Sequence, residues 1–297
     1  MISKLNAFFY NSVLSETVKN KVERLILIVA IVSFFAHLIT IFLVKNQFII
    51  IPEELNFFDS PIAAIYTPFS FILIYEVYLL IFYLPRSITT YIGKQYEIIT
   101  LIVIRRIFKD LANIELNSDW FDIKNDLYFT YDIITALVLF FMIYLFSLER
   151  QKLQVSNRIK ASAPAQIEQF IAIKKFMATI LVPVFVGIGL LTFGSWIFQH
   201  TPENLSLALK DVNSIFFDEF FAILIIVDVF LLLFSFFYTD QFHKVIRNSG
   251  FIISTILIRL SFSVDGLLNN CLIIGSIGFG LLILWIHNRF EKNINPE

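Results

Sequence analysis

Six long apolar runs constrain this chain more than any other feature of its sequence. They occupy residues 25–44, 62–84, 130–148, 176–199, 217–239 and 268–287. A helix needs about 20 mainly apolar residues to cross the hydrocarbon core of a bilayer. The composition agrees, because 58% of the residues are hydrophobic and only 16% are charged, whereas soluble domains carry about 25% charged residues. The sequence therefore predicts an all-α integral membrane protein.

Two shorter apolar runs decide between six and eight spans. Residues 96–112 and 249–264 each contain an internal arginine. Lys and Arg near the ends of spans favour the cytoplasm, and the segment richest in them is 149–175. Six spans would place that segment outside, whereas with eight spans the loop charge alternates along the whole chain. We therefore predict about eight transmembrane helices, with both termini in the cytoplasm.

The two halves of the chain resemble each other in order and in charge. When their second spans are aligned, Glu76 lies opposite Asp228, and when their third spans are aligned, Arg105 lies opposite Arg259. The alternative is chance similarity between apolar sequences. We interpret the match as a tandem duplication of a four-helix unit. An even number of spans per unit makes the repeats parallel, related by an axis along the membrane normal.

This interpretation divides the chain into five segments. A cytoplasmic interfacial segment precedes the first four-helix repeat, a basic cytoplasmic linker with an interfacial helix joins it to the second, and a cytoplasmic tail follows. Their predicted bounds are 1–24, 25–148, 149–175, 176–288 and 289–297.

The charged residues that fall deep inside the predicted spans are Glu76, Arg105, Arg106, Asp228 and Arg259. An unpaired charge at the bilayer centre costs at least about 2.5–3.5 kcal/mol. We therefore expect Glu76 to contact Arg105 or Arg106, and Asp228 to contact Arg259. Such pairs either fix the packing of each repeat or line a polar pathway, and the sequence leaves both interpretations open.

Other residues inside the spans suggest packing roles. His37, near the middle of the first span, is either a hydrogen-bonded packing residue or a proton relay. Small residues that allow close helix approach in the last span are Gly275, Ser276, Gly278 and Gly280. Prolines that predict helix bends are Pro68 in span two and Pro183 in span five.

Several classes of function lack sequence support. The chain has no Walker loop, GxGxxG fingerprint, HExxH helix or GxSxG elbow, so we predict no enzyme activity and no cofactor. Cys271 is the only cysteine and the four histidines show no ligand spacing, so we predict no metal site. The net charge of −1 gives no indication of nucleic-acid binding.

The remaining expectation is a membrane function. An acid in the second span of each unit is similar to the voltage-sensor bundle of ion channels. In that family, however, arginines repeat along the fourth span, and here they lie in the third, so the chain is assigned to no family.

We expect a channel or transporter for an ion or small solute. The alternative is a non-transporting scaffold, sensor or subunit. The expected setting is a bacterial inner membrane, as a homo-oligomer or part of a membrane complex.

Overall fold

The computed structural model describes residues 10–48, 61–111, 124–159, 165–199, 205–238, 241–264 and 266–294. Within these ranges the regular structure is helical throughout, which confirms the predicted all-α class. The helices are α2 (Glu16–Lys45), the 3-10 helix η2 (Pro61–Ile65), α3 (Tyr66–Tyr83), α4 (Ile88–Leu111), α5 (Lys124–Ile159), α6 (Ala165–Gln199), α7 (Leu205–Phe236), α8 (Phe242–Ser261) and α9 (Gly266–Ile294). All eight apolar runs lie mainly within these helices.

Local signals explain where some helices begin. The Ser15 side chain caps α2 by accepting a 3.3 Å hydrogen bond from the Val18 amide, and Glu16 lies in the first turn, where acids suit the helix dipole. Gly266, which starts α9, has a φ of 67°. A Cβ at this position would lie 2.7 Å from the Tyr128 ring, so both the backbone and the space favour glycine in the turn between α8 and α9.

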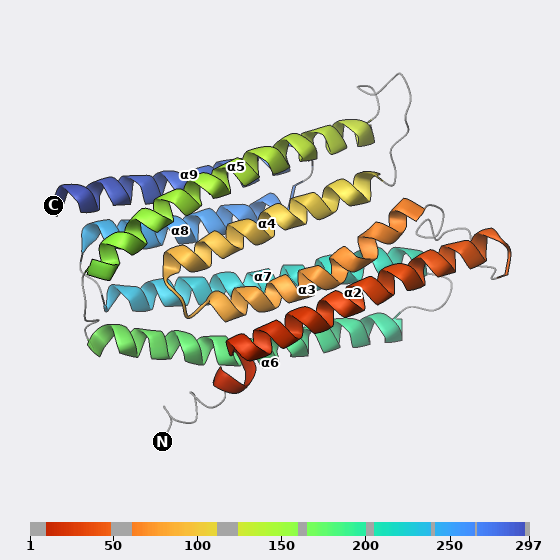
Figure 1. The fold of residues 1–297 in the computed structure, drawn as a ribbon, viewed down its shortest axis with the longest axis horizontal. Coiled ribbons are helices and arrows are strands. Elements are labelled where there is room, and N and C mark those ends of the chain that lie inside the picture. Colours follow the sequence, from red (N-terminus) through yellow and green to blue (C-terminus); the bar gives the residue numbers. More distant parts are fainter. Residues whose placement is uncertain are drawn as a thin grey trace.

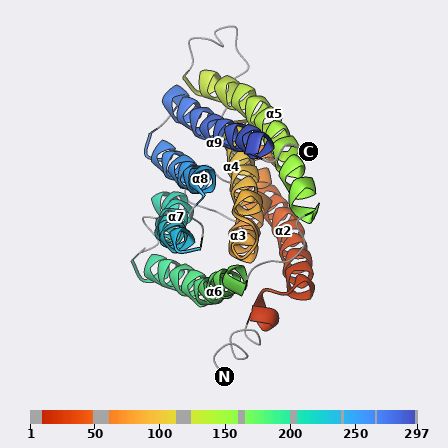
Figure 2. The ribbon, with the colours of Figure 1, turned by 90° about the vertical axis from the view of Figure 1, so that its left-hand side faces the viewer.

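The helices form one elongated bundle in which sequence neighbours pack side by side, except α5 and α6, which lie on opposite sides (Figure 1). α3 and α4 occupy the centre, with α6, α7, α8 and α9 along one side and α2 and α5 along the other (Figure 2). α5 also packs along α9, and α4 meets α8. We call the end that contains the turn at 84–87 and the start of α8 the inner end, because it corresponds to the predicted cytoplasmic side.

The bundle places apolar side chains outside and polar side chains inside. Leu137 on α5 is 68% exposed and Leu191 on α6 is 75% exposed. Buried polar residues include Glu76, Gln95, Asp132, Asp228 and Asn270. Soluble proteins rarely expose continuous apolar faces of this kind. An apolar exterior, with polar side chains confined to an otherwise apolar interior, is the arrangement that a lipid environment favours.

Five helices in the described part of the chain are long and apolar enough to cross a membrane. They are Tyr10–Lys45, Leu127–Lys152, Glu168–Leu191, Glu219–Phe236 and Gly266–Asn293, and the shorter apolar helix Thr67–Tyr83 adds to them. The fold is therefore that of an α-helical multi-pass membrane protein. α4 and α8, which carry the internal arginines, are not among the five.

Several helices extend beyond the predicted spans. α5 continues to Ile159 and α6 already begins at Ala165. The amphipathic stretch 167–175, which we expected as a separate interfacial helix in the linker, is thus continuous with α6. α2 likewise begins at Glu16 and includes the basic residues that we had placed before the first span.

Candidate functional site: a polar seam between the two halves

A hydrogen bond between two buried polar side chains joins the halves of the chain. Gln95 on α4 donates from Nε2 to Oδ2 of Asp228 on α7 over 3.1 Å. Gln95 is 6% exposed and Asp228 is 2% exposed. The hydroxyl of Tyr91, one turn before Gln95, lies beside the Asp228 carboxylate, although it and Oδ1 of Asp228 do not meet hydrogen-bond geometry within the described residues. Asp228 thus lies in a buried polar group formed with Gln95 and Tyr91 of the first half.

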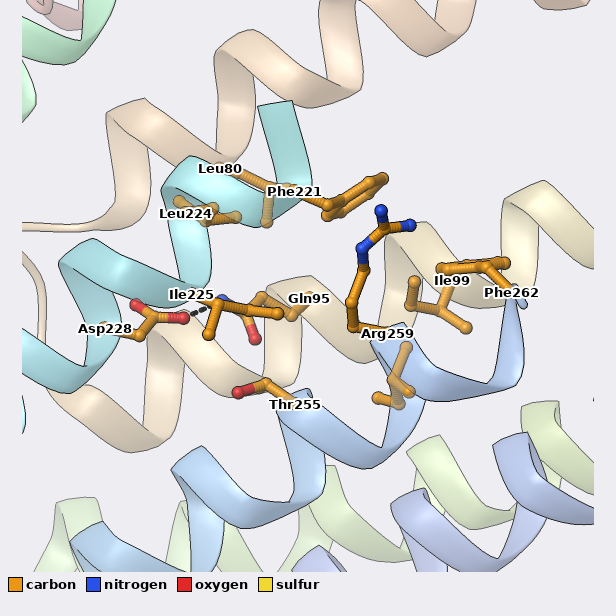
Figure 3. A pocket seen from close by; sticks show the side chains of 11 residues that line it. Leu80, Gln95, Ile99, Phe221, Leu224, Ile225, Asp228, Thr255, Arg259 and Phe262 are labelled. Carbon is orange, nitrogen blue, oxygen red and sulfur yellow. Dashed lines mark hydrogen bonds between the residues drawn. The ribbon is translucent and has the colours of Figure 1, made fainter. Parts of the chain in front are cut away.

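A small cavity of about 30 Å³ extends from Asp228 toward the outer end. Thr255 and Arg259, one turn apart on α8, contribute its other polar groups. Figure 3 shows Arg259 extending from α8 beside Phe221, with Asp228 and Gln95 at the opposite end. A cavity of this size with polar partners can hold water. Asp228 and Arg259 therefore share one cavity, although they form no direct ion pair in the described structure.

A larger cavity of about 330 Å³ lies on the inner side of Asp228. It is formed by the turn between α3 and α4, together with α4, α6, α7 and α8. Its polar and charged lining residues are Arg86, Ser87, Tyr91, Lys174, Asp228, Ser235, Arg247 and Asn248. Asp228 lines both cavities, although most of the side chains around the smaller one are apolar. We call the two cavities, with Asp228 between them, the polar seam.

The inner cavity carries more basic than acidic groups. Its basic residues are Arg86, Lys174 and Arg247, and its acidic residue is Asp228. Lys174 is 6% exposed and donates a 3.0 Å hydrogen bond to the backbone oxygen of Arg86. Arg86 also forms an exposed 2.9 Å ion pair with Glu16. The net charge of the lining is therefore positive.

A cluster from α8 and α9 holds Arg247 in place. Its guanidinium donates to Oδ1 of Asn248 over 2.9 and 3.2 Å and contacts Nε2 of His287 at 3.0 Å. Because an arginine only donates, that nitrogen of His287 must accept. His287 stacks on His243, which contacts Glu291 at 3.1 Å. The guanidinium stays charged at neutral pH, because an arginine does not lose its proton in proteins.

The expected contact of Glu76 with Arg105 or Arg106 is not formed. Glu76 is 6% exposed and takes part in no ion pair among the described residues. Its nearest charges are Lys94 and Glu97, one turn apart on α4. Arg105 lies 11 residues beyond Lys94, which is about 16 Å along a helix. The predicted contact is therefore wrong because of the relative height of α3 and α4. Glu76 faces the inner half of α4, and the two arginines lie farther toward the outer end.

Arg106 instead binds a polar cluster near the outer end. Its guanidinium forms an ion pair with Asp132 on α5, and contacts Asn269 at 2.8 Å and Asn270 on α9. Asn270 in turn donates a 2.7 Å hydrogen bond to Asp132. The cluster ties α4, α5 and α9 together. Arg105, its neighbour in sequence, does not belong to this hydrogen-bonded set.

The remaining predicted residues are distributed over the bundle. Nδ1 of His37 lies 2.6 Å from the hydroxyl of Thr67, a link between α2 and α3. Pro68 lies in the first turn of α3, directly after η2, where a proline removes no helical hydrogen bond. Pro183 lies inside α6.

The four small residues of α9 differ in what they contact. A Cβ on Gly280 would lie 1.8 Å from the Tyr96 hydroxyl, and one on Gly278 would lie 3.0 Å from Met142. The backbone oxygen of Ser276 accepts a 2.7 Å hydrogen bond from Ser254. A Cβ on Gly275 would meet no atom within 4 Å. Gly280 is therefore the position on α9 where the Tyr96 side chain of α4 leaves no room for a Cβ.

Sequence reasoning missed several residues of the seam: Tyr91, Gln95, Lys174, Ser235, Arg247 and Asn248. We had placed most of them in cytoplasmic segments, because they flank the apolar runs. The sequence feature that could have identified Tyr91 and Gln95 is the continuation of a helix beyond its apolar run. Gln95 lies one turn after Tyr91 and directly before the run at 96–112, so a helix that begins earlier brings both residues into the bundle.

Comparison with protein-family models, with curated proteins and with solved structures finds no match for this chain.

Proposed function

We propose that the chain crosses the membrane eight times, with α4 and α8 as the additional spans and both termini in the cytoplasm. Helices of 24 and 20 residues are about 36 and 30 Å long, which matches the hydrocarbon core. α4 packs between α3 and α5, and α8 packs between α7 and α9. The charge of α4 is tolerable because Lys94 pairs with Glu97 and Arg106 pairs with Asp132.

The same packing supports the proposed pair of four-helix repeats. In each half the first helix packs on the second, the second on the third and the third on the fourth. The contacts of α5 with α9 and of α4 with α8 join equivalent helices of the two halves. This pattern is the one expected for repeats related by an axis along the membrane normal. A bacterial inner membrane is the proposed setting.

The proposed function is transport of an ion or small solute along the polar seam, without enzymatic chemistry. The observation that carries it is Asp228, a buried acid that lines both cavities and is bound by Gln95 from the other half. Intramembrane ionisable residues commonly mark substrate or ion pathways. Transporter sites also commonly lie near the bilayer midplane, at the interface between repeats.

The second candidate is a non-transporting subunit of a membrane complex or a homo-oligomer. A groove of about 450 Å³ between α5 and α9 favours it, because its lining is mainly apolar and includes Leu148, Leu282 and Trp285. A partner helix or a second copy would bury this surface. In that case the charged residues of the seam would serve to fix the packing of the halves.

Ion and solute flux through the purified full-length protein in liposomes separates the two candidates. Transport predicts flux above that of empty liposomes, reduced by Asp228→Asn in protein that remains folded. The subunit role predicts no flux for cations, anions, protons or small organic solutes. It also predicts a stoichiometric partner or a defined oligomer on mild solubilisation.

A further inference from the structure

The inner cavity contains two basic side chains that form no ion pair. Lys174 and Arg247 take part in no ion pair among the residues that the structure describes. The charge of Asp228 acts on Lys174 and that of Glu291 acts on Arg247, in both cases from beyond ion-pair distance. The third acid nearby, Glu16, binds Arg86. Buried charges are ordinarily paired, because an uncompensated charge costs several kcal/mol. An anion in the cavity would supply the missing partner.

The donors around the cavity are arranged to receive such a group. An ammonium has three donors, and Lys174 uses one of them on the backbone oxygen of Arg86. Arg247 is fixed by Asn248 and His287, and its planar fork suits the two oxygens of a carboxylate or phosphate. The volume of about 330 Å³ lies within the range of about 300–1,000 Å³ typical of small-molecule sites.

We propose that the inner cavity binds a small oxyanion, a carboxylate or phosphate group, between Lys174 and Arg247. The remaining hydrogen-bonding atoms of the cavity narrow the chemical class of the ligand. Oδ1 of Asp228 and the hydroxyl of Tyr91 lie beside each other in the lining of the same cavity, outside hydrogen-bond geometry. A ligand that also carries a hydroxyl or ammonium donor satisfies Asp228. The preferred ligand is therefore a small organic acid with such a donor.

The same chemistry has two sources, a soluble anion and the headgroup of an anionic lipid. Passage of a soluble anion through the seam rests on the proposed function, whereas binding does not depend on transport. If the seam transports its ligand, the bound anion is also the transported substrate. Binding of the anion can be measured without any transport.

The test measures the Tm of the full-length protein in phosphatidylcholine nanodiscs. The probes are sodium phosphate, sodium glycolate and sodium acetate, against sodium chloride at equal ionic strength. A ligand that binds the native state raises Tm in a saturable manner. We expect such a rise, with glycolate stronger than acetate because its hydroxyl can donate to Asp228. Asp228→Asn should reduce that difference.

Charge variants assign the binding to the cavity. Lys174→Gln and Arg247→Gln should weaken binding at least tenfold, whereas Lys174→Arg, which keeps the charge and guards against loss of folding, should retain it. Arg289→Gln is the matched control, because Arg289 lies over Trp285 at the same end and does not line the cavity. Equal weakening by Arg289→Gln would indicate a general surface effect and would overturn the proposal.

A second set of nanodiscs containing phosphatidylglycerol identifies the source. If a headgroup occupies the site, that lipid alone raises Tm in a Lys174-dependent manner, and phosphate then adds nothing. The absence of any Lys174-dependent shift with either lipid or the soluble probes would contradict the proposal. Anion binding without flux would contradict the proposed transport function and support the anion site. Flux without anion binding would support transport and contradict the anion site.

Discussion

The Nε2 atom of Gln95 lies 3.1 Å from Oδ2 of Asp228, across 133 positions of sequence. This bond connects α4 in the first half with α7 in the second, at the point where the two cavities meet. An amide can donate to a carboxylate without neutralising its charge. The contact therefore holds Asp228 in place while leaving its second oxygen facing the seam, which is a different arrangement from an acid locked in an ion pair.

The amide of Gln95 is specific in this role. Gln95→Glu puts a second carboxylate beside Asp228, and two adjacent carboxylates repel in a buried setting. We expect the Tm at neutral pH to fall by several degrees. The double variant Gln95→Glu with Asp228→Asn exchanges the two groups and should recover more than half of the loss. Equal losses in the single and double variants would mean that the contact does not contribute to stability.

The Tyr96 side chain of α4 makes Gly280 on α9 intolerant of a side chain. A Cβ there would lie 1.8 Å from the Tyr96 hydroxyl, and overpacking of this kind typically costs about 1–3 kcal/mol. Gly280→Ala should therefore lower the Tm in detergent. Gly275→Ala is the control, because no atom lies within 4 Å of its Cβ, and it should leave the Tm unchanged or raise it. Adding Tyr96→Phe should restore part of the loss at Gly280.

The ion pair of Arg106 with Asp132 should stabilise the fold, whereas the charge of Glu76 should not. Removal of one partner from a buried pair costs about 3–5 kcal/mol. The cost for Asp132→Ala should lie below that range, because the Arg106 side chain is 31% exposed. Glu76→Gln removes a buried carboxylate that has no ion pair, so it should leave the Tm unchanged or raise it. A larger loss for Glu76→Gln than for Asp132→Ala would refute this assignment.

The hydrophobic pattern of the sequence predicted the helices, but it could not predict which side chains contact each other. Six apolar runs of span length and two shorter ones fall within α2 to α9 of the described residues, because segments that contact lipid must be apolar whatever the packing. The residues Glu76, Asp228 and Arg259 were found for the same reason, since charge inside a span is costly. Their partners were not found, because contact depends on helix register. Lys94 and Arg105 lie on the same helix, and only the relative height of α3 and α4 decides which of them is near Glu76.

The inner cavity was harder to predict for a physical reason. Lys174 and Arg247 lie near the ends of apolar runs, where basic residues usually contact water and lipid headgroups. Here the helices extend past the runs and pack against one another, so the same residues become part of the bundle. Loop-charge rules report the side of the membrane and carry no information about burial.

The number of spans can be tested by cysteine labelling, because the chain has one native cysteine. In a Cys271→Ser background, Gln151→Cys lies on the cytoplasmic side if α4 crosses the membrane and outside if it does not. Gln47→Cys, outside in both topologies, and Ser87→Cys, inside in both, are the controls; all three positions are exposed. With a membrane-impermeant maleimide on intact cells, we expect Gln47→Cys alone to react. Labelling of Gln151→Cys at the same level would support six spans.

The most direct test of the polar seam compares flux in liposomes for the wild type, Asp228→Asn and Glu76→Gln. Both variants neutralise a buried acid on equivalent helices of the two halves, but only Asp228 lines the cavities. The account predicts measurable flux in the wild type, a reduction of at least tenfold in folded Asp228→Asn, and flux close to the wild type in Glu76→Gln. Equal flux in all three proteins, or no flux in the wild type, would contradict it.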